Sequence, residues 1–180
     1  MLKAKNEHEE KKTKILGNIF ANVAFFPGFS VGEANHLLQI AQNLTYRGMC
    51  ILALIKRKDQ IQGVKLREDS YRGSIGERVS YETVSILQEA YQIYNSGLIA
   101  CKQKSSEKYE EASLGTQLIG IVNQDASKER SLEEYEALLG CADVAPNRLL
   151  LSPMAERYYE VMGLEDIPEE DIKEIAKYLI

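Results

Sequence analysis

The sequence predicts a mainly α-helical fold of six or seven helices, with a small antiparallel β element of two or three strands. The 180 residues are 44% hydrophobic, which is enough apolar material for a packed domain. Apolar side chains recur mostly every three to four positions, the spacing of a helix face. We expect an amphipathic N-terminal helix with a charged leader over residues 1–28, and one mainly helical domain over residues 29–180 with a β insertion at about 98–151.

The first predicted helix is amphipathic, with its apolar side chains on one face. A lysine-rich stretch, residues 3–14, precedes this face and suggests a segment that extends away from the body. We therefore expect the face to contact another chain. The alternative is that it closes the core of its own chain. The face consists of Ile15, Leu16, Ile19, Phe20 and Val23.

Two further helices have clear start signals. Ser30 and Glu33 form the pattern of a capping box, in which each side chain binds the backbone amide of the other residue. Thr45 caps the next helix, which we expect over residues 46 to about 58. Apolar residues cover nearly the whole circumference of that helix between positions 49 and 55, which predicts a helix in the core.

Three cations end this core helix: Lys56, Arg57 and Lys58. Positive side chains are favoured at the carboxyl end of a helix, because they complement the helix dipole. The alternative is that these residues contact the phosphate groups of a nucleic acid.

Periodicity fails over residues 59–79, where glycines are mixed with charged side chains. A polar connection of about 20 residues is uncommon in a packed domain unless it has a function or is disordered. We therefore regard Arg67, Asp69, Tyr71 and Arg72 as the candidate contact for a ligand or partner. The same loop could supply an acid and a base to an enzyme.

The clearest helix end predicted in the chain is at Gly97. Ser80 caps the helix before it. A left-handed glycine ends such a helix, with Leu98 folded back toward Ile93.

Strands and helices alternate after this exit. Strand composition marks residues 98–101, 114–122 and 148–151. Capping signals predict helices that begin at Ser131, at Ser152 and near Pro168.

The helix stripes and strands together predict the core. A core position must be apolar and must lie on the covered face of its element. The expected core residues are Leu37, Leu52, Leu54, Leu87, Leu98, Leu151, Tyr158 and Ile175.

Two junctions in the sequence resemble those of winged-helix domains. Residues 94–99 read Tyr-Asn-Ser-Gly-Leu-Ile, and residues 149–158 read Leu-Leu-Leu-Ser-Pro-Met-Ala-Glu-Arg-Tyr. In that superfamily a helix ends in a similar turn, a hairpin follows, and the returning strand enters a last helix through a serine or threonine cap. The resemblance implies that the insertion forms a wing, and that the helix over residues 80–94 reads nucleic acid.

The distribution of charge disfavours nucleic acid as a partner. The formal net charge is −5, and residues 131–180 carry 4 basic and 12 acidic side chains, whereas residues 1–60 carry 9 and 5. A surface that binds a duplex needs several cations together to meet its phosphates.

The cysteines indicate a reducing compartment. Cys50, Cys101 and Cys141 are widely spaced and odd in number, which is typical of reduced thiols in a cytoplasmic protein. No pair of candidate ligands has the close spacing of a metal site, so we expect no metal. The longest aliphatic run, residues 49–55, is far shorter than the roughly 20 residues needed to cross a bilayer, so we expect no membrane span.

These observations favour a non-enzymatic cytoplasmic regulatory or scaffold domain that acts through a protein partner or through self-association as a homodimer. The first alternative is a winged-helix regulator that binds nucleic acid. The second is an enzyme that uses the loop over residues 59–79. Because the sequence contains no P-loop, dinucleotide fingerprint, nucleophile elbow or paired-histidine motif, we expect no cofactor.

Overall fold

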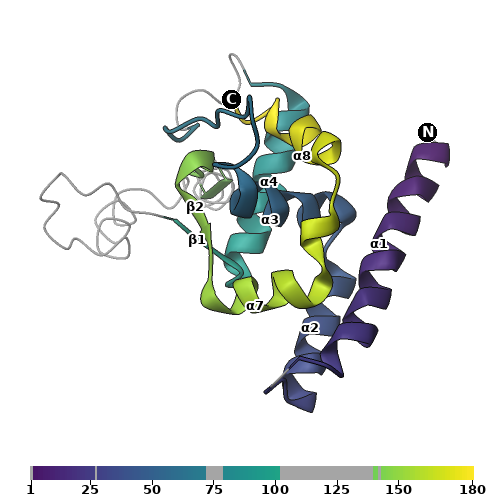
Figure 1. Cartoon of the computed structure of the whole chain (residues 1–180). Helices are drawn as coiled ribbons and strands as arrows, with labels where there is room; N and C mark the ends of the chain where they lie inside the picture. The colour runs from purple at the N-terminus through teal and green to yellow at the C-terminus, as the bar shows by residue number, and fades with distance from the viewer. Residues whose placement is uncertain (1, 27, 72–78, 102–139, 142) are drawn as a thin grey trace, which may run out of the picture.

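One helix occupies the centre of the fold and the others surround it (Figure 1). The computed structural model describes residues 2–26, 28–71, 79–101, 140–141 and 143–180, with side chains from residue 10 onward. Within these residues it has six α-helices and a two-stranded antiparallel sheet, which confirms the predicted mainly α-helical fold with a small β element. The elements are α1 (Leu2–Val23), α2 (Val31–Asn43), α3 (Tyr46–Arg57), α4 (Tyr81–Asn95), β1 (Ile99–Cys101), η1 (Pro146–Arg148), β2 (Leu149–Leu151), α7 (Pro153–Met162), η2 (Leu164–Asp166) and α8 (Glu169–Ala176).

The central helix is α3, as its all-apolar circumference predicts. Every residue from Met49 to Ile55 is at most 5% exposed. The elements α1, α4, α8, β2 and η2 all contact α3. The expected core residues are buried, except for Leu151, which is half-buried at the end of β2.

The predicted helix ends are confirmed in their hydrogen bonds. The Ser30 hydroxyl accepts from the Glu33 amide at 3.1 Å, and the Glu33 carboxylate accepts from the Ser30 amide at 2.8 Å. The hydroxyls of Thr45, Ser80 and Ser152 each accept the amide three residues further on. Each of these bonds satisfies a backbone donor that would otherwise lack a partner at the first helical turn.

The exit from α4 into the sheet is also confirmed. Gly97 has a φ of 76°, and the Leu98 amide donates to the Ile93 carbonyl at 3.3 Å. The strand β1 then pairs with β2 in the register Ile99 with Leu151. The strand predicted at residues 114–122 and the helix predicted from Ser131 lie outside the described residues.

The predicted polar connection after α3 is more deeply anchored than its sequence indicates. In its described part, Ile61, Leu66 and Tyr71 are all buried. The backbone at Arg67 donates to the Leu179 carbonyl at 2.8 Å and accepts from the Asn147 amide at 3.0 Å. The sequence does not reveal this burial, because the three buried residues are five positions apart and so follow neither the helix period nor the strand period.

The helix α1 lies along one side of the body, with α2 beside its carboxyl-terminal half (Figure 1). Ile15 and Ile19 are buried against their own chain, and Leu16 and Val23 are half-buried. These four side chains of the predicted partner-facing helix are therefore occupied by intramolecular packing. Phe20 is the member of that set that stays exposed, at 68%.

Two asparagines fix α1 to the end of α7. The side-chain amide of Asn22 donates to the Val161 carbonyl at 3.0 Å, and that of Asn18 donates to the Met162 carbonyl at 3.4 Å. Carbonyl groups in the last turn of a helix have no partner within the helix, so these amides satisfy them from outside. Gly163 ends α7 with a φ of 65°, and a Cβ atom there would lie 2.8 Å from Asn18 Nδ2.

We predict that Gly163→Ala lowers the free energy of unfolding more than Gly97→Ala does. Both glycines have positive φ, but Gly97 has open space around it, so its replacement costs about 1 kcal/mol. Gly163→Ala also displaces Asn18 from its hydrogen bond, for a total of about 2 kcal/mol. Urea unfolding of both variants measures the difference. Equal losses, or no reduction of the Gly163→Ala cost when Asn18→Ala is added, would contradict this account of the docking of α1.

We predict an acid-dependent contribution from Glu33. The backbone hydrogen bond from Ser30 holds the pKa of this carboxyl below its ordinary value of 4.5. A lowered folded-state pKa means that the stabilisation is present above the unfolded value and is lost as the pH falls through the folded one. Chemical unfolding of the wild type and of Glu33→Gln from neutral pH to below 4.5 should therefore show their difference in stability shrinking with acidification. A constant difference would refute the prediction.

Candidate functional site

The connection between α1 and α2 presents large apolar side chains to solvent. Phe25 is 85% exposed and Val31 is 79% exposed, and Phe20 lies on the last turns of α1 beside them in the chain. We call Phe20, Phe25 and Val31 the phenylalanine tip. Exposed apolar patches mark interaction surfaces, whereas single exposed apolar residues are common on any protein.

The connection that carries Phe25 is anchored to the body. Phe26 and Phe29 are half-buried against the core and meet edge to face, with ring centroids 6.1 Å apart. Arg157 of α7 lies over the Phe29 ring at 5.2 Å and forms an ion pair with Glu33 at 2.9 Å. Aromatic packing and one charged pair thus hold this connection.

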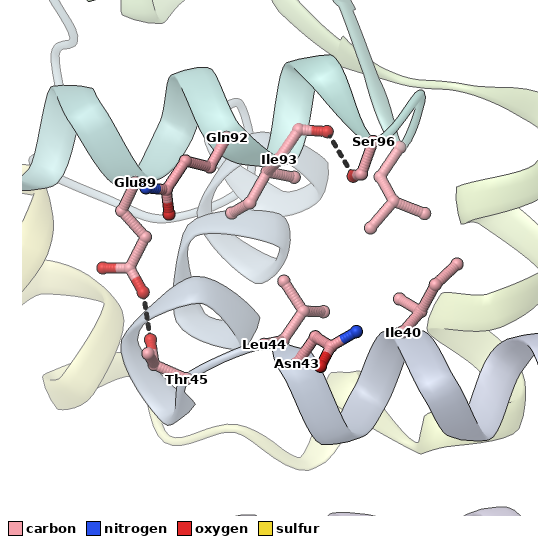
Figure 2. Close-up of a pocket in the computed structure, with 9 residues that line it drawn as sticks. Ile40, Asn43, Leu44, Thr45, Glu89, Gln92, Ile93 and Ser96 are labelled. Atoms are coloured by element: carbon pink, nitrogen blue, oxygen red, sulfur yellow. Dashed lines mark hydrogen bonds between the residues drawn. The ribbon is translucent and has the colours of Figure 1, made fainter.

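A cleft of about 240 Å³ lies at the other end of α2, between α2, the start of α3 and α4. Figure 2 shows Ile93 of α4 and Leu44 and Ile40 of the α2 side pointing into the space between the helices. Leu98 completes the apolar wall. The polar residues that line the cleft are Asn43, Thr45, Glu89, Gln92 and Ser96.

The acidic group in the cleft is engaged by its own chain. The Thr45 hydroxyl donates to the Glu89 carboxylate (Figure 2). Arg47 donates to the same carboxylate at 2.5 Å and to Glu82 at 2.9 Å. Because these bonds occupy Glu89, the cleft offers mainly an apolar wall with uncharged amides at its edge, which suits an apolar side chain.

The structure brings together three of the four candidate residues of the loop. The Arg67 guanidinium lies 4.6 Å from the centre of the Tyr71 ring and donates to the Asp69 carbonyl at 3.2 Å. Arg148 forms an ion pair with the Asp69 carboxylate at 3.5 Å. Burial raises the pKa of Tyr71, whose hydroxyl has no hydrogen-bond partner among the described residues. Arg72 lies outside the described residues.

The three cations at the end of α3 bind groups of their own chain. Arg57 donates to the Ile167 carbonyl at 2.8 Å, and Lys58 donates to the Leu149 carbonyl at 2.9 Å. Lys56 forms an ion pair with Glu156. These contacts tie α3 to α7, to β2 and to the turn before α8, and they give no support to phosphate binding by these residues.

The described part of the chain has neither a membrane-spanning helix nor a group of metal ligands. None of its helices is long and apolar enough to cross a bilayer. Among the same residues, no three cysteine, histidine or acidic side chains are grouped to hold a metal ion.

The comparisons with known proteins leave the family open. No family model matches the chain, and no curated protein or solved structure is significantly similar to it. The resemblance to winged-helix domains therefore stays a prediction. The helix that would read nucleic acid, α4, carries Glu82 and Glu89 and contains no lysine or arginine.

The sequence pattern placed Phe20 on the partner-facing face of the first helix, but it did not predict Phe25, Val31 or the cleft. The available signal was compositional: residues 15–46 contain one charged side chain, Glu33, in a chain whose charged fraction is 27%. That run indicates a surface without charge, but it does not say which apolar side chains the fold leaves exposed.

We predict that the cysteines differ in reactivity. Burial raises the pKa of the Cys50 thiol to about 12 and also raises that of Cys141, whereas Cys101 is exposed. Since the thiolate is the reactive form, iodoacetamide at pH 8 should modify Cys101 in the folded protein and the other two only in denaturant. Mass spectrometry of the alkylated protein measures this, with Cys101→Ser as the control. Alkylation of folded Cys50 at the rate of Cys101 would contradict the packing of α3.

Proposed function

We propose that this protein is a non-enzymatic cytoplasmic interaction module that acts through self-association, and that the phenylalanine tip is its contact surface. The observation that carries the proposal is the exposure of two large aromatic side chains, Phe20 on the last turns of α1 and Phe25 in the connection to α2. Large aromatic side chains anchor interfaces because each buries a large apolar area at a low cost in side-chain entropy.

The scarcity of charge around the tip supports a protein partner. Interface cores are depleted of charged residues relative to the rest of a surface. A membrane-binding surface would carry lysine or arginine beside its apolar groups, and residues 15–46 contain neither. The nearest described cation, Arg157, is paired with Glu33.

A second copy of the chain is favoured as the partner, because the chain carries both an exposed apolar side chain and an apolar cleft. Phe25 is 85% exposed, and Ile40, Leu44 and Ile93 line the cleft. In a twofold interface each contact occurs twice, so one copy can supply an apolar side chain to the cleft of the other and the reverse.

We predict that Phe25→Ser weakens self-association. Removing a buried aromatic anchor from an interface costs about 2 kcal/mol or more, which corresponds to a dissociation constant about thirtyfold higher. Light scattering and sedimentation over a dilution series measure the change from dimer to monomer. The matched control is Tyr81→Ser, which removes a 91% exposed aromatic side chain from the start of α4.

The proposal fails if the wild type is a monomer throughout the dilution series. It also fails if Tyr81→Ser dissociates the dimer as strongly as Phe25→Ser does. Circular dichroism of each variant shows whether its helices are retained. We expect them to be retained, because the replaced side chains are exposed in the single chain.

A further inference from the structure

The same chain carries an apolar projection and an apolar hollow, one at each end of α2. Phe25 precedes the first residue of α2, and Ile40 and Leu44 at its other end line the cleft. A helix of 13 residues is about 20 Å long, so α2 separates the two features by roughly that distance.

The outward face of α2 between these features carries no lysine, arginine, aspartate or glutamate. The Nδ1 atom of His36 on this face lies 2.8 Å from the Tyr158 hydroxyl. An amide side chain carries both a donor and an acceptor, so a row of amides can form hydrogen bonds with a second copy of itself. The exposed residues of this face are Gly32, Asn35, His36, Gln39, Gln42 and Asn43.

We infer that two copies associate about a twofold axis with their α2 helices antiparallel, so that Phe25 of each copy enters the cleft between α2 and α4 of the other. This inference rests on the proposed self-association and adds its geometry. An antiparallel pair of α2 helices places the tip end of one copy beside the cleft end of the other, and the symmetry makes that contact twice.

The chemistry of the cleft fits this occupant. The walls formed by Ile40, Leu44 and Ile93 match a phenyl ring, which needs no hydrogen-bond partner. The amides of Asn43 and Gln92 at the edge stay in contact with solvent or with the backbone of the entering connection. Because the twofold axis makes the same contact twice, both clefts are filled in the dimer and no further copies can join it through this contact.

The experiment is a disulfide trap placed so that Phe25 itself is kept. In a Cys101→Ser background, Ala24→Cys is combined with Gln92→Cys at the edge of the cleft. Two cysteines can bridge only when their Cα atoms lie within about 7 Å. The matched control combines Ala24→Cys with Tyr81→Cys, which is on the same helix but at its other end. Mild oxidation and non-reducing electrophoresis give the yield of linked dimer.

A dimer that is linked through Ala24→Cys and Gln92→Cys, and not through the control pair, supports the inference. A second variant, Ile40→Phe, fills the cleft from its own wall and should convert the dimer to a monomer while Phe25 stays in place. If the wild type is a dimer but the two pairs link equally or not at all, the inference is overturned and the proposed self-association stands. If the wild type is a monomer, both are overturned.

Discussion

A helix with apolar side chains on every side is stable only where other elements cover it completely, and α3 imposes this constraint on the whole chain. The residues from Met49 to Ile55 leave no face for water. The helices α1, α4 and α8, the 3-10 turn η2 and the strand β2 pack around it. Arg57, the last residue of α3, binds the Ile167 carbonyl, and Lys58 after it binds the Leu149 carbonyl. The end of the core helix therefore also positions the elements around it.

The hairpin of α1 and α2 is attached to this body by a smaller set of contacts. Ile15 and Ile19 supply the apolar part, and Asn18 and Asn22 supply hydrogen bonds to the last carbonyls of α7. In the connection between α1 and α2, Phe26 and Phe29 are half-buried against the core, whereas Phe25 stays exposed.

The proposed self-association uses an apolar side chain and an apolar cleft that the packing of the core leaves accessible. The cleft lies between α2 and α4 beside the start of α3, where Arg47 and Thr45 bind the Glu89 carboxylate. The projection and the cleft are separated by the length of α2, and the face between them carries amides. In the antiparallel orientation, Phe25 of each copy meets the cleft of the other, and the uncharged faces of the two α2 helices meet between these contacts.

The sequence by itself determined the helix limits, because they depend on bonds between residues close in the chain. The Ser30 capping box, the caps at Ser80 and Ser152 and the glycine exit at Gly97 are all contacts within five residues, and each could be predicted. The central place of α3 followed from composition alone. Only the tertiary structure decided which polar residues are structural: Asn18 binds a carbonyl 144 positions away. The burial of Tyr71, the occupied cations after α3 and the cleft beside Ile93 likewise depend on contacts between distant segments, and local periodicity carries no record of those contacts.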